Sequence, residues 1–219
     1  INRPPFDSPS SEALFARGPA GLHACRIAAL DFPGHGGSGL PGGGLPFGFL
    51  TLEDYVTVVL ASLERLPALG VRPDSVVAHS QGGLLVQLAQ QALSDRGTNL
   101  RKAFNVREVV LLASVPPRQV PWSFADNGTA LAVLASFVAF DPALGPHVAI
   151  PDPVWPALFF SNLLSVVAPG APAPEDVARF NAPEPLVSGL ELIGALNVLG
   201  LPPTPRPSVD AGIFGDGSK

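Results

Sequence analysis

Charged side chains and cysteines are scarce in this chain of 219 residues. Asp, Glu, Lys and Arg make up 14% of it, against about 25% in a typical globular protein. The net charge is -5 and the basic residues are scattered, so a nucleic-acid partner is disfavoured. The single cysteine, Cys25, excludes an internal disulfide, and the sequence therefore neither requires nor excludes an oxidising compartment.

Methionine and long apolar runs are also absent. A primary translation product begins with methionine, so we expect Ile1 to be internal to a longer gene product. The most apolar stretch, residues 130–140, falls short of the roughly 20 residues that a transmembrane helix needs. The first residues do not show the charged and apolar regions of a signal peptide. These absences predict no membrane span and favour a cytoplasmic location.

A short apolar run ends at Ser80, and a helical pattern follows it at once. Small residues stand two positions before and two after this serine, at Ala78 and Gly82, and His79 and Gln81 fill the positions between. The pattern is typical of a nucleophile elbow, a tight strand-to-helix turn whose central serine is strained and whose neighbours must be small. The usual motif has glycine at the first small position, so Ala78 departs from it by one methyl group. An ordinary strand-to-helix connection would fit the same pattern.

A second motif lies upstream, in residues 31–39, which read Asp-Phe-Pro-Gly-His-Gly-Gly-Ser-Gly. Its defining residues are Asp31, Gly34, His35 and Gly36. This segment resembles the loop after the fourth strand in the α/β-hydrolase family, which shows Asp, any residue, Pro-Gly-His-Gly, any residue, Ser. The two motifs have the order and spacing of that family. The resemblance is specific over residues 12–117 and looser elsewhere.

The same glycines allow a different reading. Gly34, Gly36 and Gly39 satisfy the G-x-G-x-x-G spacing that can hold a dinucleotide pyrophosphate at a helix N-terminus. The segment that follows, residues 40–46, is rich in proline and glycine and does not form the required helix. We therefore expect no nucleotide, and neither a cofactor nor a metal.

The periodicity of the first half predicts strands that alternate with helices. Thr51 to Asp54 fits a capping box, and the apolar residues that follow repeat every three and four positions. Continuous apolar runs such as the one around Val109 are typical of strands that are buried on both faces. The fold class is therefore α/β, with a mostly parallel sheet flanked by helices. The expected strands are 25–31, 74–79 and 106–114, and the expected helices are 12–17, 52–66 and 82–94.

The second half has a different character, with helical patterns divided by prolines. We expect residues 1–117 to be the N-terminal part of the hydrolase core, 118–205 a helical lid, and 206–219 the start of a return to the core. A plain helical subdomain is the alternative to a lid. An apolar helix face in this region would cover a cleft for an acyl or aromatic group. The expected helices are 128–140, 153–167, 174–180 and 184–199, with no strand between them.

The resemblance implies a nucleophilic mechanism at Ser80. The family orders its residues as Ser, then Asp or Glu, then His, and its serine attacks an ester, thioester or similar carbonyl. The backbone N–H of Gln81 would be one oxyanion donor. Asp216 is the candidate acid, after an expected strand at 211–214, although Gly-Asp-Gly is also a common turn. His35 and His79 belong to the two motifs, where they would orient the loops.

The base has no clear candidate. His147 is the one histidine that follows Ser80 in the chain, and a solvated loop histidine beside Pro146 is the preferred reading of it. We therefore expect the chain to stop before the family's catalytic histidine and, as given, to show little or no turnover. Two hypotheses follow: the chain is a portion of a serine hydrolase that acts on a small apolar ester-like substrate, or it is a truncated, non-catalytic binding protein of the same fold. Serine at position 80 argues against the epoxide-hydrolase and dehalogenase branches, which need a carboxylate nucleophile.

Overall fold

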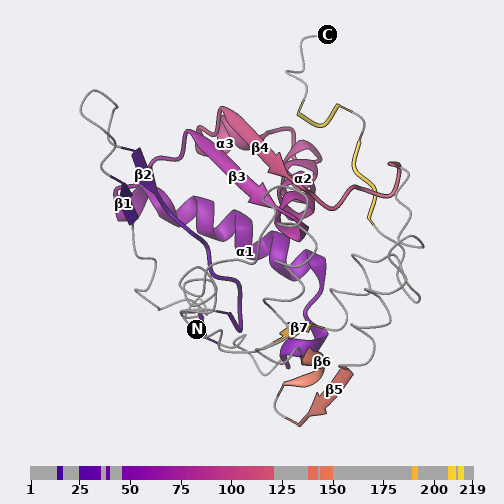
Figure 1. Cartoon of the computed structure of the whole chain (residues 1–219). Helices are drawn as coiled ribbons and strands as arrows, with labels where there is room; N and C mark the ends of the chain where they lie inside the picture. Colours follow the sequence, from indigo (N-terminus) through magenta and orange to yellow (C-terminus); the bar gives the residue numbers. More distant parts are fainter. Residues whose placement is uncertain are drawn as a thin grey trace, which may run out of the picture. The chain divides into compact units, whose positions relative to one another are not determined.

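The computed structural model describes residues 14–16, 25–35, 38–39, 46–120, 138–142, 144–149, 189–191, 207–210 and 212–214 (Figure 1). The chain divides into two compact units. We call one the sheet-helix unit; it comprises Glu12–Leu30, Leu50–Asp126 and Ile193–Lys219. We call the other the hairpin unit; it comprises Ile1–Ser11, Asp31–Phe49 and Asn127–Leu192.

The centre of the sheet-helix unit is a pair of parallel strands. Strand β3 (Ser75–His79) pairs with β4 (Glu108–Leu112), from Ser75 opposite Glu108 to His79 opposite Leu112. The chain between them forms helices α2 (Gln81–Ser94) and α3 (Leu100–Phe104). Parallel strands joined through helices confirm the predicted α/β class (Figure 1). Strands 74–79 and 106–114 and helix 82–94 were predicted to within about two residues at each end.

Helix α1 (Leu52–Arg65) begins where its capping box predicts. Thr51 Oγ1 accepts a hydrogen bond from the N–H of Asp54, and Asp54 Oδ2 accepts one from the N–H of Thr51 at 2.8 Å. A short 3-10 helix, η3 (Leu66–Leu69), continues α1, and Gly70 ends it with a φ of 73°. The buried face of α1 packs against α2. Its buried residues are Leu52, Tyr55, Val58, Val59 and Leu63.

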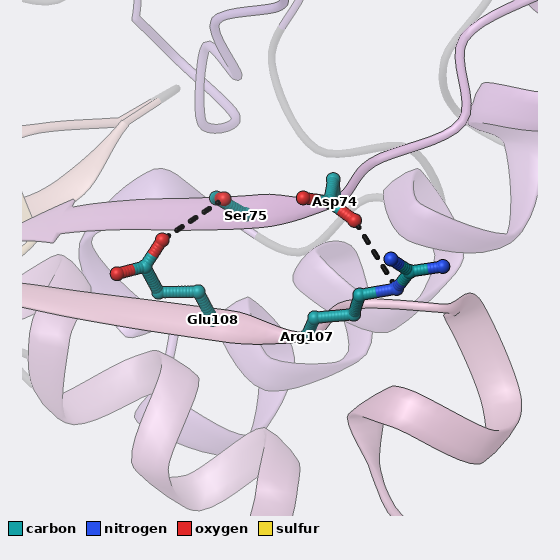
Figure 2. A network of polar contacts seen from close by, with 4 residues as sticks. All are labelled: Asp74, Ser75, Arg107 and Glu108. Atoms are coloured by element: carbon teal, nitrogen blue, oxygen red, sulfur yellow. Dashed lines mark hydrogen bonds and ion pairs between the residues drawn. The ribbon is translucent and has the colours of Figure 1, made fainter.

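Polar side chains join the amino ends of β3 and β4 (Figure 2). Arg107 Nε lies 3.3 Å from Asp74 Oδ1, and the N–H of Arg107 donates to the carbonyl of Asp74 at 2.7 Å. Ser75 Oγ donates to Glu108 Oε2 at 3.3 Å. The Arg107–Asp74 ion pair is exposed, so it adds less than about 1 kcal/mol to stability. The ion pair lies just before the first paired residues of the two strands. The turn at Ser80 lies at the opposite, carboxyl ends of these strands.

The first two strands differ from the prediction. Strand β1 (Leu14–Ala16) pairs with β2 (Cys25–Ile27) in an antiparallel way. The helix expected over 12–17 is therefore wrong at 14–16, and the strand expected over 25–31 is confirmed only for its first three residues. Ile27 and Leu30 are 50% and 42% exposed. Burial on both faces was expected for the run around Val109, and it is wrong there, since Leu111 and Leu112 of β4 are 37% and 48% exposed.

The hairpin unit holds an antiparallel sheet of order β5-β6-β7. Its strands are β5 (Val138–Asp141), β6 (Gly145–Ala149) and β7 (Gly189–Glu191). The helices predicted over 128–140 and 184–199 are therefore wrong at 138–140 and 189–191, and the expected absence of strands is wrong as well. Short apolar runs fit both helix and strand. In this unit a tight turn between β5 and β6 accompanies the strand conformation. Gly145 adopts a φ of 73°, and Asp141 accepts a hydrogen bond from the N–H of Leu144.

The short 3-10 helix η2 (Phe47–Phe49) packs on β6. Phe47 is fully buried, and the N–H of Gly48 donates to the carbonyl of Leu144 at 2.6 Å. A Cβ added at Gly48 would lie 2.6 Å from the carbonyl carbon of Pro146. This close approach explains why the segment before α1 carries glycine at position 48. The predicted helices 153–167 and 174–180 lie outside the described residues, and the domain boundaries at 117 and 205 stay predictions.

Candidate functional site at the Ser80 turn

Ser80 is the one residue between β3 and α2, and its backbone is strained. Its φ is 52° and its ψ is -123°, in a region that favours glycine and costs other residues on the order of 1–3 kcal/mol. Its side chain is exposed. Strand and helix thus meet at this serine without a connecting loop, and we call residues 79–82 the Ser80 turn. Strain of this kind often marks a functional residue.

Hydrogen bonds to the end of β4 and to the residues just after it hold the Ser80 turn in place. The N–H of Ser80 donates to the carbonyl of Leu112 at 3.0 Å, and its carbonyl accepts from the N–H of Val115 at 2.9 Å. The N–H of Gly83 donates to the same carbonyl at 3.1 Å. Both backbone groups of Ser80 are therefore bonded, and these bonds offset the cost of its conformation.

A second strained residue lies at the same end of the strand pair. Ala113 follows β4 directly and has a φ of 42°. Ser80 and Ala113 thus occupy the carboxyl ends of two paired parallel strands. Ligands of open α/β sheets bind outside that edge. The location of the strain therefore favours a site here.

The structure shows which small residues around Ser80 lie in crowded positions. Ala78 is buried, as a small residue before the turn should be. A Cβ added at Gly82, however, would meet no atom of the described residues within 4 Å. Crowding comes one position later, where a Cβ on Gly83 would lie 2.5 Å from the Cβ of Ser114. Among the described residues the crowding is therefore at position 83, and the need for a small residue at 82 stays a prediction.

Gln81 is the first residue of α2. Its N–H therefore belongs to a helix N-terminus, which carries a partial positive charge and stabilises a negative charge placed near it. His79 is the last residue of β3 and is exposed. It is the only histidine among the described residues of the sheet-helix unit.

The other motif, residues 31–39, belongs to the hairpin unit and is closed by its own hydrogen bonds. The N–H of Gly34 donates to the carbonyl of Gly39 at 3.0 Å, and Ser38 Oγ donates to the carbonyl of Asp31 at 2.7 Å. His35 Nδ1 lies 3.2 Å from the carbonyl oxygen of Pro33, and its ring lies 5.5 Å from that of Phe47. Gly36 lies outside the described residues. That the two motifs lie side by side stays a prediction, because they belong to different units.

The structure describes the candidate base, His147, but not the candidate acid, Asp216. His147 lies in β6 with 7% of its surface exposed, and its Nδ1 is 3.0 Å from the carbonyl oxygen of Gly145. The preferred reading of a solvated loop histidine is therefore wrong. Asp216 lies outside the described residues, and the strand expected before it, at 211–214, is a turn over 212–214.

Sequence reasoning missed a set of glutamines that anchor the last described segment. Gln91 binds Asp210 twice, through its amide nitrogen to Oδ2 and through its oxygen to the N–H. Gln90 Nε2 donates to the carbonyl of Ile213 at 3.1 Å. Gln91 stands ten residues after the start of α2, or about 15 Å along the helix axis, so Asp210 is not at the Ser80 turn. The partners of these glutamines lie more than a hundred residues further along the chain, so no local pattern in the sequence indicates them.

The described residues contain no group of three His, Cys, Asp or Glu side chains that could hold a metal ion. They also contain no helix that is long and apolar enough to cross a membrane.

Comparison with protein families identifies the chain. The model of the alpha/beta hydrolase family matches residues 5–214. The match covers nearly the whole chain, so the protein belongs to the alpha/beta hydrolase family. Comparisons with curated proteins and with solved structures gave no match.

Proposed function

We propose that this protein is a serine hydrolase in which Ser80 is the nucleophile and the Ser80 turn is a nucleophile elbow. The observation that carries the proposal is the conformation of Ser80, an exposed serine held at a φ of 52° between a parallel strand and a helix. Family membership supports hydrolase chemistry. A plain strand-to-helix connection has no need for a strained non-glycine residue at this point.

The proposed reaction acts on an ester, thioester or similar carbonyl of a small apolar substrate. Ser80 Oγ bonds to the carbonyl carbon as a base takes its proton. The backbone N–H of Gln81 and the N-terminus of α2 stabilise the negative oxygen that forms. The bond to the leaving alcohol or thiol breaks, the leaving group takes up the proton, and water then hydrolyses the acyl-enzyme.

Labelling with a fluorophosphonate tests the nucleophile. The reagent forms an Oγ–P bond with loss of fluoride, and only an activated serine reacts at a useful rate. We expect a single label on the peptide that contains Ser80. Ser80→Ala should abolish it, and Ser94→Ala, at the exposed far end of α2, should leave it unchanged. A folded protein without label at Ser80 contradicts the proposal.

The alternative is a binding protein of the same fold without turnover. One observation favours it: the histidine that follows Ser80 in the chain is buried in β6 and its Nδ1 lies within hydrogen-bond distance of a backbone carbonyl oxygen. Apolar p-nitrophenyl esters separate the two functions. Hydrolysis that Ser80→Ala abolishes supports the enzyme, whereas saturable ester binding without hydrolysis supports the alternative.

A further inference from the structure

A buried amide lies in the middle of α2, close to the Ser80 turn. Gln87 has 8% of its surface exposed. Its Nε2 donates to the carbonyl of Gly83, one turn earlier, at 3.1 Å, and to Ser114 Oγ at 3.3 Å. Burying an amide is unfavourable unless it is hydrogen bonded, and an apolar residue would fill the same place in the helix without that cost. The amide therefore has a use beyond packing.

The partner of this amide lies in the segment that holds Ser80. Ser114 Oγ donates to the carbonyl of Val115 at 3.1 Å, and the N–H of Val115 donates to the carbonyl of Ser80 at 2.9 Å. Ser114 also packs directly on Gly83. A continuous path of contacts thus runs from α2 through Ser114 and Val115 to the backbone of Ser80.

This segment needs support because it is itself strained. Leu112 and Val115 both bond to Ser80, and Ala113 lies between them with a φ of 42°. If residues 113–115 relaxed, both bonds to Ser80 would lengthen together. The bond from Gln87 to Ser114 ties this segment to a rigid helix and opposes that relaxation.

We propose that Gln87 and Ser114 are positioning residues that hold the segment after β4 against the Ser80 turn and so set the reactive conformation of Ser80. The inference rests on the proposed function of Ser80 as a nucleophile. The two residues touch neither substrate nor reacting atoms. Their effect passes through Val115 and Gly83 to the backbone of Ser80.

Labelling kinetics test the proposal, with Gln87→Met and Ser114→Ala compared against Gln90→Met. Gln90 is equally buried on α2, but its amide binds the N–H of Leu100 and the carbonyl of Ile213 instead. Fluorophosphonate labelling gives a maximal rate constant, an affinity and a labelled fraction. We expect the first two variants to lower the maximal rate constant by about tenfold to a hundredfold at unchanged affinity. In Gln90→Met the maximal rate constant should stay within about twofold of the wild-type value. A variant that only unfolds part of the protein lowers the labelled fraction and not the rate constant.

Equal rate constants in all three variants, or a loss that appears only in the labelled fraction, would overturn the proposal. If one of the two variants does not fold, the other decides. Amide exchange measured by NMR provides a readout that does not depend on reactivity. We expect faster exchange at the N–H groups of Ser80 and Val115 in Gln87→Met, and at that of Leu100 in Gln90→Met.

The two readouts separate this proposal from the proposed function. A wild-type protein that takes no label, but whose Ser80 and Val115 amides lose protection in Gln87→Met, contradicts the nucleophile and supports the positioning role. Protection at Ser80 and Val115 that is unchanged in both Gln87→Met and Ser114→Ala contradicts the positioning role, whether or not Ser80 is labelled.

Discussion

Ser80 combines an unfavourable backbone with full hydrogen bonding of its own N–H and C=O. Leu112 and Val115 bind those two groups from another strand end, so the conformation persists although serine disfavours a φ of 52°. A residue kept in such a state is stabilised by its surroundings and not by its own preference. Replacing it with a residue that prefers this φ should therefore stabilise the protein.

The first prediction concerns Ser80→Gly. Glycine adopts positive φ without a steric penalty, so we expect the free energy of unfolding to rise by about 1 kcal/mol as labelling is lost. Urea unfolding measures the change. Ser75→Gly is the control: Ser75 lies inside β3, where glycine weakens a strand. A Ser80→Gly protein that is less stable than the wild type would contradict a strained Ser80.

The second prediction compares Gly83→Ala with Gly82→Ala. The new methyl group at position 83 would overlap Ser114, and overpacking costs about 1–3 kcal/mol. At position 82 the methyl group meets no described atom within 4 Å, and alanine favours a helix by about 1 kcal/mol over glycine. We expect opposite changes in urea unfolding. Equal changes would show that Gly83 and Ser114 are not in close contact.

Helix α1 is an element whose start, buried face and end could all be predicted from local sequence patterns. Its capping box, its apolar spacing and its stop at Gly70 are all properties of neighbouring residues, and they were predicted from the sequence. Strands β5 and β6 show the opposite, because a run such as Val138 to Phe140 fits a helix and a strand equally well until its partner is known.

The third prediction tests the start of α1. Thr51→Ala removes the hydroxyl that accepts the N–H of Asp54, so we expect a loss of about 1 kcal/mol in the free energy of unfolding. Thr57→Ala is the matched control: Thr57 is exposed within the helix, and its hydroxyl donates to the carbonyl of Glu53. It should be neutral or slightly stabilising. Thermal or urea unfolding measures both, and similar losses would contradict a specific role for the cap.

Within the sheet-helix unit, side-chain amides join segments that are far apart in the chain. Gln119 pairs with Val209 as a strand neighbour would, donating from Nε2 to its carbonyl at 2.7 Å and accepting from its N–H at 3.2 Å. The N–H of Arg118 donates to the carbonyl of Pro207 at 2.9 Å. The segment 207–210 is therefore held to the chain after β4 by contacts that no local pattern predicts.

The fourth prediction tests this attachment with Gln119→Ala. We expect the N–H of Val209 to exchange about fivefold faster, since a lost hydrogen bond costs about 1 kcal/mol. Arg118→Ala is the control because Arg118 is attached through its backbone, which the substitution keeps. NMR exchange of Val209 measures the effect. Similar rates in the wild type and in Gln119→Ala would show that the amide does not hold the segment.

Part of the site was visible in the sequence, and part was not. The small residues around Ser80 and the apolar run before it indicated a turn between strand and helix, and the structure has that turn. The crowding at Gly83 and the buried amide of Gln87 both involve Ser114, about thirty residues further along the chain. Such contacts leave no periodic trace, so they could not be predicted from the sequence.

The amino-acid order alone specifies α1, α2, β3 and β4, since caps, apolar spacing and strand-ending residues act over a few neighbours. It also places Ser80 at the junction of strand and helix. Three-dimensional packing sets the rest: the antiparallel partner of β2, the sheet of the hairpin unit and the hold of Leu112 and Val115 on Ser80. The pairing of β6 with β7 and the bonds to Ser80 join residues more than thirty positions apart in the chain, whose partners only the folded backbone brings together.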